Sequence, residues 1–103
     1  MSEVRLAPEA VDELNEAATW YEERSEGLGT ELLDEVEKVL QRIGALPESF
    51  PRLLDVPEDL EIRRALLPRF PYALVFTPTG VEIQVIAVAH LKRRPGYWLN
   101  RVR

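Results

Sequence analysis

The sequence contains no cysteine and a single histidine, His90. The absence of cysteine excludes disulfide bonds, thiolate nucleophiles and sulfur-ligated metal sites, and it is typical of proteins that work in a reducing compartment. A single histidine excludes a nuclease built on a pair of histidines and gives little support to a metal site. We therefore expect no metal site, and we expect no cofactor.

Long apolar runs are also absent. The longest one, Val85 to Ala89, has five residues, whereas a membrane-spanning helix needs about 20. The opening segment, MSEVRLAPEAVDELNE, is charged from its third residue onward and lacks the apolar centre of a signal peptide. There are no repeats or low-complexity segments, so we expect one domain, 1–103. Because an apolar run and a signal peptide are also absent, we expect a soluble protein in the cytoplasm without a membrane partner.

The first half of the chain has few basic residues, and the second half has few acidic ones. Residues 1–60 hold 5 Lys or Arg against 16 Asp or Glu, a formal charge of −11, and residues 61–103 hold 8 against 2, a formal charge of +6. One interpretation is a basic functional surface on an acidic body that keeps the protein soluble. The alternative is that acidic helices merely pair with basic strands, because most surface charges serve solvation or local pairing.

The first half of the chain has the periodicity of two amphipathic helices. A short alternating segment at 3–7 predicts a strand, and apolar residues at three- and four-residue spacing then predict a helix from about Pro8 to Glu26. Gly27-Leu28-Gly29 interrupts this pattern, and we expect Thr30 to cap a second helix. The two apolar stripes comprise Val11, Leu14, Ala18 and Tyr21 in the first helix and Leu32, Val36, Val39, Ile43 and Leu46 in the second.

Residues 47–60 separate the two halves, and their prolines and acidic residues predict a loop. The apolar side chains of this loop, Phe50, Leu53 and Leu54, are expected to anchor it to the core. The other aromatic residues expected to be buried against the sheet are Trp20, Phe70, Phe76 and Trp98.

Branched and aromatic residues then predict three strands. These strands are expected at 61–67, 72–77 and 81–90, followed by a helical turn around 97–101. The last strand is apolar on both faces over its second half, so we expect it to lie centrally and to be covered on both sides. The predicted fold is α+β: a small two-layer domain of order β-α-α-β-β-β, with an N-terminal strand and an antiparallel helical hairpin packed on a mainly antiparallel sheet.

A series of segments in this order resembles the RelE/ParE superfamily of type II toxin–antitoxin toxins. The resemblance implies a compact antiparallel sheet flanked by a helical hairpin. It also implies an antitoxin that wraps the toxin and, in many members, covers its active surface. The segments that carry the resemblance are APEAVDELNEAATWYE at 7–22, Gly27-Leu28-Gly29, EVEKVLQRIGALPESFP at 35–51, Arg63-Arg64, RFPYALVF at 69–76 and VIAVAHLKRRPGYW at 85–98.

The superfamily divides by function, so the resemblance implies two activities. RelE-like members cleave mRNA on the ribosome, whereas ParE-like members inhibit DNA gyrase and have no known hydrolytic role. We expect growth arrest by a metal-independent mRNA endoribonuclease that a cognate antitoxin neutralises. The alternatives are a ParE-like gyrase inhibitor and a decayed toxin that only binds antitoxin. One observation favours the alternatives: the second half has one lysine, Lys92, where mRNA-cleaving members carry several.

The candidate catalytic residues are His90, Arg93, Arg94 and Tyr97, which lie within eight residues of one another. Cleavage through the 2′-hydroxyl requires a base, an acid and cations that stabilise charge on the phosphate. His90 can transfer a proton near neutral pH, and the two arginines can each bind phosphate through a planar fork. The resemblance implies a role for a tyrosine near the C-terminus, which Tyr97 matches. The alternatives are structural: a histidine that caps the strand, solvated arginines and a ring packed onto the sheet.

Three further cations, Arg63, Arg69 and Lys92, are candidates for substrate binding. Arg63 and Arg64 are adjacent on a predicted strand, so they point to opposite faces and only one can share the site. Arg69 directly precedes another strand, where the resemblance implies contact with substrate. The alternative for Arg69 is an ion pair with the acidic loop at 55–61.

Overall fold

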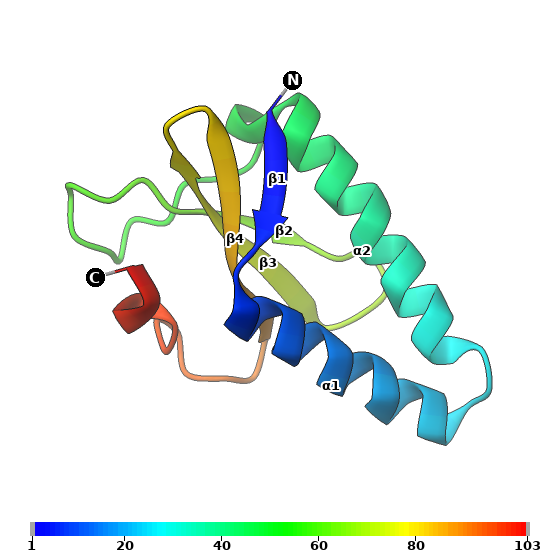
Figure 1. Ribbon diagram of the computed structural model, residues 1–103. Coiled ribbons are helices and arrows are strands. Elements are labelled where there is room, and N and C mark those ends of the chain that lie inside the picture. Colours follow the sequence, from blue (N-terminus) through cyan, green and yellow to red (C-terminus); the bar gives the residue numbers. More distant parts are fainter. Residues whose placement is uncertain (1, 103) are drawn as a thin grey trace.

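The computed structural model describes residues 2–102. Figure 1 shows the two helices and the C-terminal turn on different sides of a central sheet. No helix within residues 2–102 is long and apolar enough to cross a membrane. The elements are β1 (Glu3–Leu6), α1 (Pro8–Arg24), α2 (Leu28–Ala45), the 3-10 turn η1 (Pro47–Ser49), β2 (Arg63–Leu66), β3 (Tyr72–Thr79), β4 (Glu82–His90) and the 3-10 turn η2 (Leu99–Val102).

The four strands form one sheet in the order β1-β4-β3-β2. β3 is antiparallel to both β2 and β4, whereas β1 is parallel to β4. The prediction of an α+β fold with a mainly antiparallel sheet and a central last strand is thus confirmed, with a parallel strand added at one edge. β1 pairs with β4 only from Glu82 to Val85. The second half of β4 therefore extends beyond its neighbour on that side.

Each face of the sheet has its own apolar cluster. On one face α1 and α2 pack onto the strands through side chains that include Ala17, Val39 and Leu74. On the other face the loop before β2 and the C-terminal tail cover Val75 and Ile86. The second half of β4 is apolar on both faces because both of its faces are covered. The side chains of Phe50, Phe70, Phe76 and Trp98 are buried, as predicted.

A β-bulge in β4 determines the side on which His90 lies. Residues 85 and 87 of β4 pair with consecutive residues of β3, so Ile86 is an extra residue. Val85 and Val88, on either side of the bulge, both pack in the cluster that faces the helices. Because side chains alternate along a strand, His90 lies on the helix-facing side as well.

The helical hairpin depends on Glu22 and Gly29. The carboxylate of Glu22 accepts hydrogen bonds from the backbone N–H groups of Gly27 and Gly29, at 2.9 Å each, and so caps the start of α2. A Cβ atom on Gly29 would lie 2.5 Å from the carbonyl oxygen of Ala18, so only glycine permits this approach of the helices. The prediction that Thr30 caps α2 is wrong, because α2 begins before that residue.

Some apolar side chains that were expected in the core are exposed. Trp20 is 49% exposed and lies under the guanidinium of Arg24, 3.4 Å from its ring centroid, rather than between helix and sheet. Leu46 and Leu54 are 67% and 90% exposed. The place of Leu46 in the apolar stripe of the second helix and the anchoring role of Leu54 are therefore wrong. Leu53 packs against the second apolar cluster and anchors the loop.

Candidate functional site

A groove of about 560 Å³ lies on the sheet face opposite the helices, between the loop at 53–56 and the tail at 94–98. Its floor is formed by buried apolar side chains of β3 and β4. One carboxylate, Asp55, also lines it. We call this hollow the basic groove because its titratable and cationic lining residues include Arg64 of β2, His90 at the end of β4, and Arg93 and Arg94 of the tail.

A second hollow, of about 420 Å³, lies between α1 and the paired ends of β3 and β4. We call it the aromatic cleft because Trp20, Tyr21 and Tyr72 line it. His90 and Arg93 line both the aromatic cleft and the basic groove. These two side chains therefore stand at the junction of the two hollows.

His90 is oriented by the turn that follows β4. Its Nδ1 accepts a hydrogen bond from the backbone N–H of Lys92, and its carbonyl oxygen accepts one from the N–H of Arg93, both at 3.0 Å. The ring meets Tyr72 edge to face, with centroids 5.0 Å apart. Because Nδ1 is an acceptor, the neutral imidazole carries its proton on Nε2. Nε2 can thus donate a hydrogen bond to a ligand.

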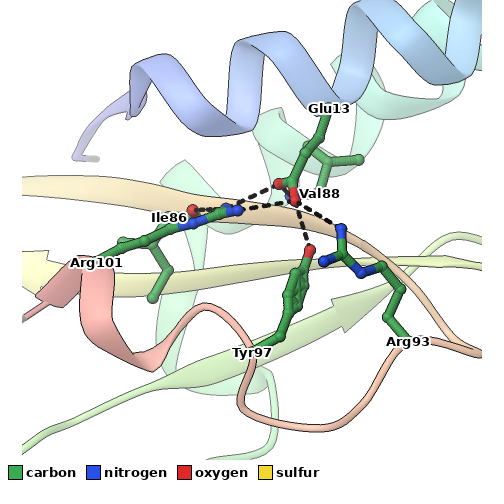
Figure 2. A network of polar contacts seen from close by, with 6 residues as sticks. All are labelled: Glu13, Ile86, Val88, Arg93, Tyr97 and Arg101. Carbon is green, nitrogen blue, oxygen red and sulfur yellow. Dashed lines mark hydrogen bonds and ion pairs between the residues drawn. The ribbon is translucent and has the colours of Figure 1, made fainter.

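A carboxylate from α1 organises the C-terminal tail (Figure 2). The hydroxyl of Tyr97 donates to Glu13 at 2.7 Å, and the guanidinium of Arg101 donates to both carboxylate oxygens at 3.0 and 3.1 Å. The backbone N–H of Val88 donates to the same carboxylate at 3.0 Å. The guanidinium of Arg93 lies 3.8 Å from Glu13 and 3.8 Å from the ring centroid of Tyr97. We call these five residues the Glu13 network; it joins α1, β4 and the tail.

The network sets the protonation states of Glu13 and Tyr97. Burial opposes ionisation of Glu13, but hydrogen bonds from Arg101, Tyr97 and Val88 outweigh it and lower the pKa of Glu13. Burial, together with the hydrogen bond to Glu13, raises the pKa of the Tyr97 phenol well above its usual value. Tyr97 therefore stays protonated at neutral pH and cannot act as a general base in this arrangement.

The four candidate catalytic residues all line the basic groove. Arg93 and Arg94 are exposed there, and His90 is half-buried. Tyr97 contributes its ring, because its hydroxyl is bound to Glu13. Lys92 is exposed next to these residues but does not line either hollow. Within residues 2–102 no three His, Asp or Glu side chains form a group that could hold a metal ion.

The structure places Arg63 and Arg69 away from the basic groove. The side chain of Arg63 is 16% exposed and donates to the carbonyl oxygen of Phe50 at 2.7 Å. Arg69 forms ion pairs with Glu31 and Glu35 of α2, at 3.1 and 2.9 Å. The alternative partner expected for Arg69, the acidic loop before β2, is therefore wrong. In this part of the molecule an acidic helix does pair with a basic segment.

Three residues of the site were not among the candidates: Arg64, Glu13 and Arg101. Arg64 lines the basic groove from the edge strand β2. A signal for Glu13 was present in the sequence, because Glu13 lies three residues after Ala10 and four before Ala17, the two buried residues of α1. A carboxylate on the buried face of a helix requires a polar or cationic partner. Arg101 supplies that partner from the tail.

The comparisons with known proteins concern the fold. No protein-family model matches the chain, and no curated protein matches it. Among solved structures, a chain of the "Chromosomal ParDE TA system from P. aeruginosa" is similar, with 21% sequence identity and a TM-score of 0.65. The similarity covers 89% of this chain and 98% of that chain. The fold that the motif resemblance implied is thus confirmed: this chain has a ParE-like α+β fold.

Proposed function

We propose that the chain is the toxin of a type II toxin–antitoxin pair, which arrests growth by cleaving mRNA on the ribosome and is neutralised by a cognate antitoxin. The observation that carries the proposal is that Arg64, Arg93 and Arg94 line one groove with an apolar floor, with His90 at its border with the aromatic cleft. The likeness of the fold to a chain of the ParDE system supports the toxin role.

The basic groove offers groups suited to RNA cleavage. Arg93 and Arg94 can hold a phosphate through charge-assisted hydrogen bonds and stabilise the charge that develops on it in the transition state. His90 lines the same groove beside Arg93, and imidazole is the side chain most often used for general acid–base catalysis. We assign proton transfer to His90 rather than to Tyr97, because the Tyr97 hydroxyl donates its hydrogen bond to Glu13.

The same groove suits an antitoxin. Its apolar floor and basic rim complement a peptide segment that carries both apolar and acidic side chains. An antitoxin segment bound there would cover His90, Arg93 and Arg94 and so exclude RNA. Neutralisation would then be simple competition for one surface.

Gyrase inhibition by a non-enzymatic, ParE-like mechanism is the second candidate. The observation that favours it is the engagement of Tyr97 with Glu13, which leaves the groove without a free phenol for acid–base chemistry. A binding surface needs no proton transfer, and the arginines of the groove would serve it equally well.

Induction of the chain without antitoxin in bacterial cells tests the two candidates. The measurement is a map of new mRNA 5′ ends within minutes of induction. Cuts inside translated codons are expected, and they should disappear with His90→Ala and Arg93→Ala. Lys38→Ala, which removes an exposed cation from α2, is the matched control and should leave the cuts unchanged. Growth arrest with intact transcripts would favour gyrase, and the absence of any arrest would contradict the toxin proposal.

A further inference from the structure

The Glu13 network occupies the place of a missing strand. β1 ends opposite Val85, and beyond that point the β1-facing edge of β4 is completed by side chains. The Val88 N–H donates to Glu13 at 3.0 Å, and the Ile86 carbonyl oxygen accepts from Arg101 at 2.9 Å. Unpaired backbone groups in a buried position cost stability, so Glu13 and Arg101 are bound in a fixed place on the edge of the sheet.

Tyr97 and Arg93 extend from this fixed point. The Tyr97 hydroxyl is held by Glu13 at 2.7 Å, which fixes the position of the ring (Figure 2). The guanidinium of Arg93 lies over that ring and 3.8 Å from the carboxylate. The Arg93 side chain is 56% exposed, so it remains accessible to a ligand. Its guanidinium is oriented by the Tyr97 ring and the Glu13 carboxylate.

We propose that Glu13 is a positioning residue that acts through Tyr97 to hold Arg93 at the junction of the basic groove and the aromatic cleft. The inference deepens the proposed function, on which it rests for the identity of the ligand: the ordered guanidinium receives a phosphate of single-stranded RNA. An arginine held in place loses less side-chain entropy on binding than a mobile one does. Tyr97, one of the candidate catalytic residues, then serves as a support for Arg93.

Electrostatics alone predicts the opposite effect of Glu13. Its carboxylate is a negative charge close to a site for a polyanion, so its removal should strengthen RNA binding if charge were the only contribution. Positioning predicts that removal weakens binding. The sign of the change in affinity therefore separates the two roles, and Asp12→Asn provides a matched control. Asp12 is an exposed neighbour on α1 for which no ion pair or side-chain hydrogen bond is found within residues 2–102.

The test measures Arg93 and RNA affinity separately. In NMR spectra of the free protein, the side-chain protons of Arg93 should be shifted upfield by the Tyr97 ring, and Glu13→Gln should remove this shift. Binding of a short fluorescein-labelled single-stranded RNA should weaken about tenfold in Glu13→Gln, the effect of losing one charge-assisted phosphate contact. Asp12→Asn should leave the Arg93 shifts unchanged and bind RNA at least as tightly as the wild type.

Tyr97→Phe removes only the hydroxyl and keeps the inference testable if Glu13→Gln does not fold. Tyr97→Phe should weaken RNA binding several-fold. The double variant with Glu13→Gln should bind RNA only slightly more weakly, because both changes break the same series of contacts from Glu13 through Tyr97 to Arg93. Unchanged Arg93 shifts and unweakened RNA affinity in both variants would overturn the inference. A wild type that binds no RNA would contradict the proposed substrate alone, because loss of the Arg93 shifts in Glu13→Gln would still support the positioning role.

Discussion

At the scale of single residues, Glu13 makes the attachment of the tail depend on the solution pH. Its carboxylate accepts hydrogen bonds from Arg101, Tyr97 and the Val88 backbone, and only the ionised form can accept all of them. These bonds lower the pKa of Glu13 against the effect of burial. The folded state therefore binds a proton at this site less readily than the unfolded state does.

The sign of the pH effect follows from this lowered pKa. In the unfolded chain a glutamate titrates near pH 4.3, so the network contributes its full stability above about pH 5. The contribution is lost as the pH falls through the lower pKa of the folded state. We expect the free energy of unfolding of the wild type to exceed that of Glu13→Gln at neutral pH, by an amount that shrinks below about pH 5. Urea denaturation of both proteins at a series of pH values measures this difference, and a constant difference down to about pH 3 would contradict the assignment.

Single residues also show why the site could be predicted only in part. The sequence points to His90, Arg93 and Arg94 because their chemistry suits a phosphate and because they lie at the end of a strand or directly after it. All three residues line the basic groove. The sequence cannot distinguish Arg64 from Arg63, because strand alternation places neighbouring side chains on opposite faces without telling which face each one takes. That choice depends on the register of β2 with β3, which is a long-range property.

At the scale of elements, the bulge at Ile86 had no counterpart in the predicted pattern. Without it the alternation that begins at Val85 would send His90 to the opposite face of the sheet. The order of helices and strands was predictable because it follows from local periodicity and from glycine and proline. The capping of α2 was not, because Glu22 reaches it from the preceding helix, whereas a local rule pointed to Thr30.

The turn between the helices yields a prediction about stability. Gly29→Ala should destabilise the protein by about 1–3 kcal/mol, because the added methyl group meets the Ala18 carbonyl at 2.5 Å and must separate the helices. Thr30→Ala should change the free energy of unfolding by less than about 0.5 kcal/mol, whereas loss of a true N-cap costs about 1 kcal/mol. Urea denaturation of the two variants is the measurement. A larger loss in Thr30→Ala than in Gly29→Ala would contradict the geometry of the hairpin.

At the scale of the whole molecule, the two interpretations of the charge asymmetry are both partly right. The acidic first half does pair with the basic second half, through Arg69 with α2 and through Arg101 with Glu13. In these pairs each arginine lies next to a carboxylate of the same molecule, so they add little net positive charge to the surface. The arginines that line the basic groove are Arg64, Arg93 and Arg94, so the usable positive charge is much smaller than the composition of the second half suggests.

Under the proposed function, the salt dependence of RNA binding measures this usable charge. Each phosphate neutralised on a single strand contributes about −0.7 to the slope of log affinity against log salt concentration. Three groove arginines therefore predict a slope of about −2, whereas all 8 Lys and Arg of residues 61–103 would give a slope near −6. Titration of labelled single-stranded RNA at a series of KCl concentrations provides the value.

Arg94→Ala should make the slope shallower by about 0.7, and Arg69→Ala should leave it unchanged, because Arg69 is already neutralised by α2. A steep slope that Arg69→Ala reduces would mean that the ion pairs with α2 open on binding, and that RNA spreads over the sheet instead of lying in the groove.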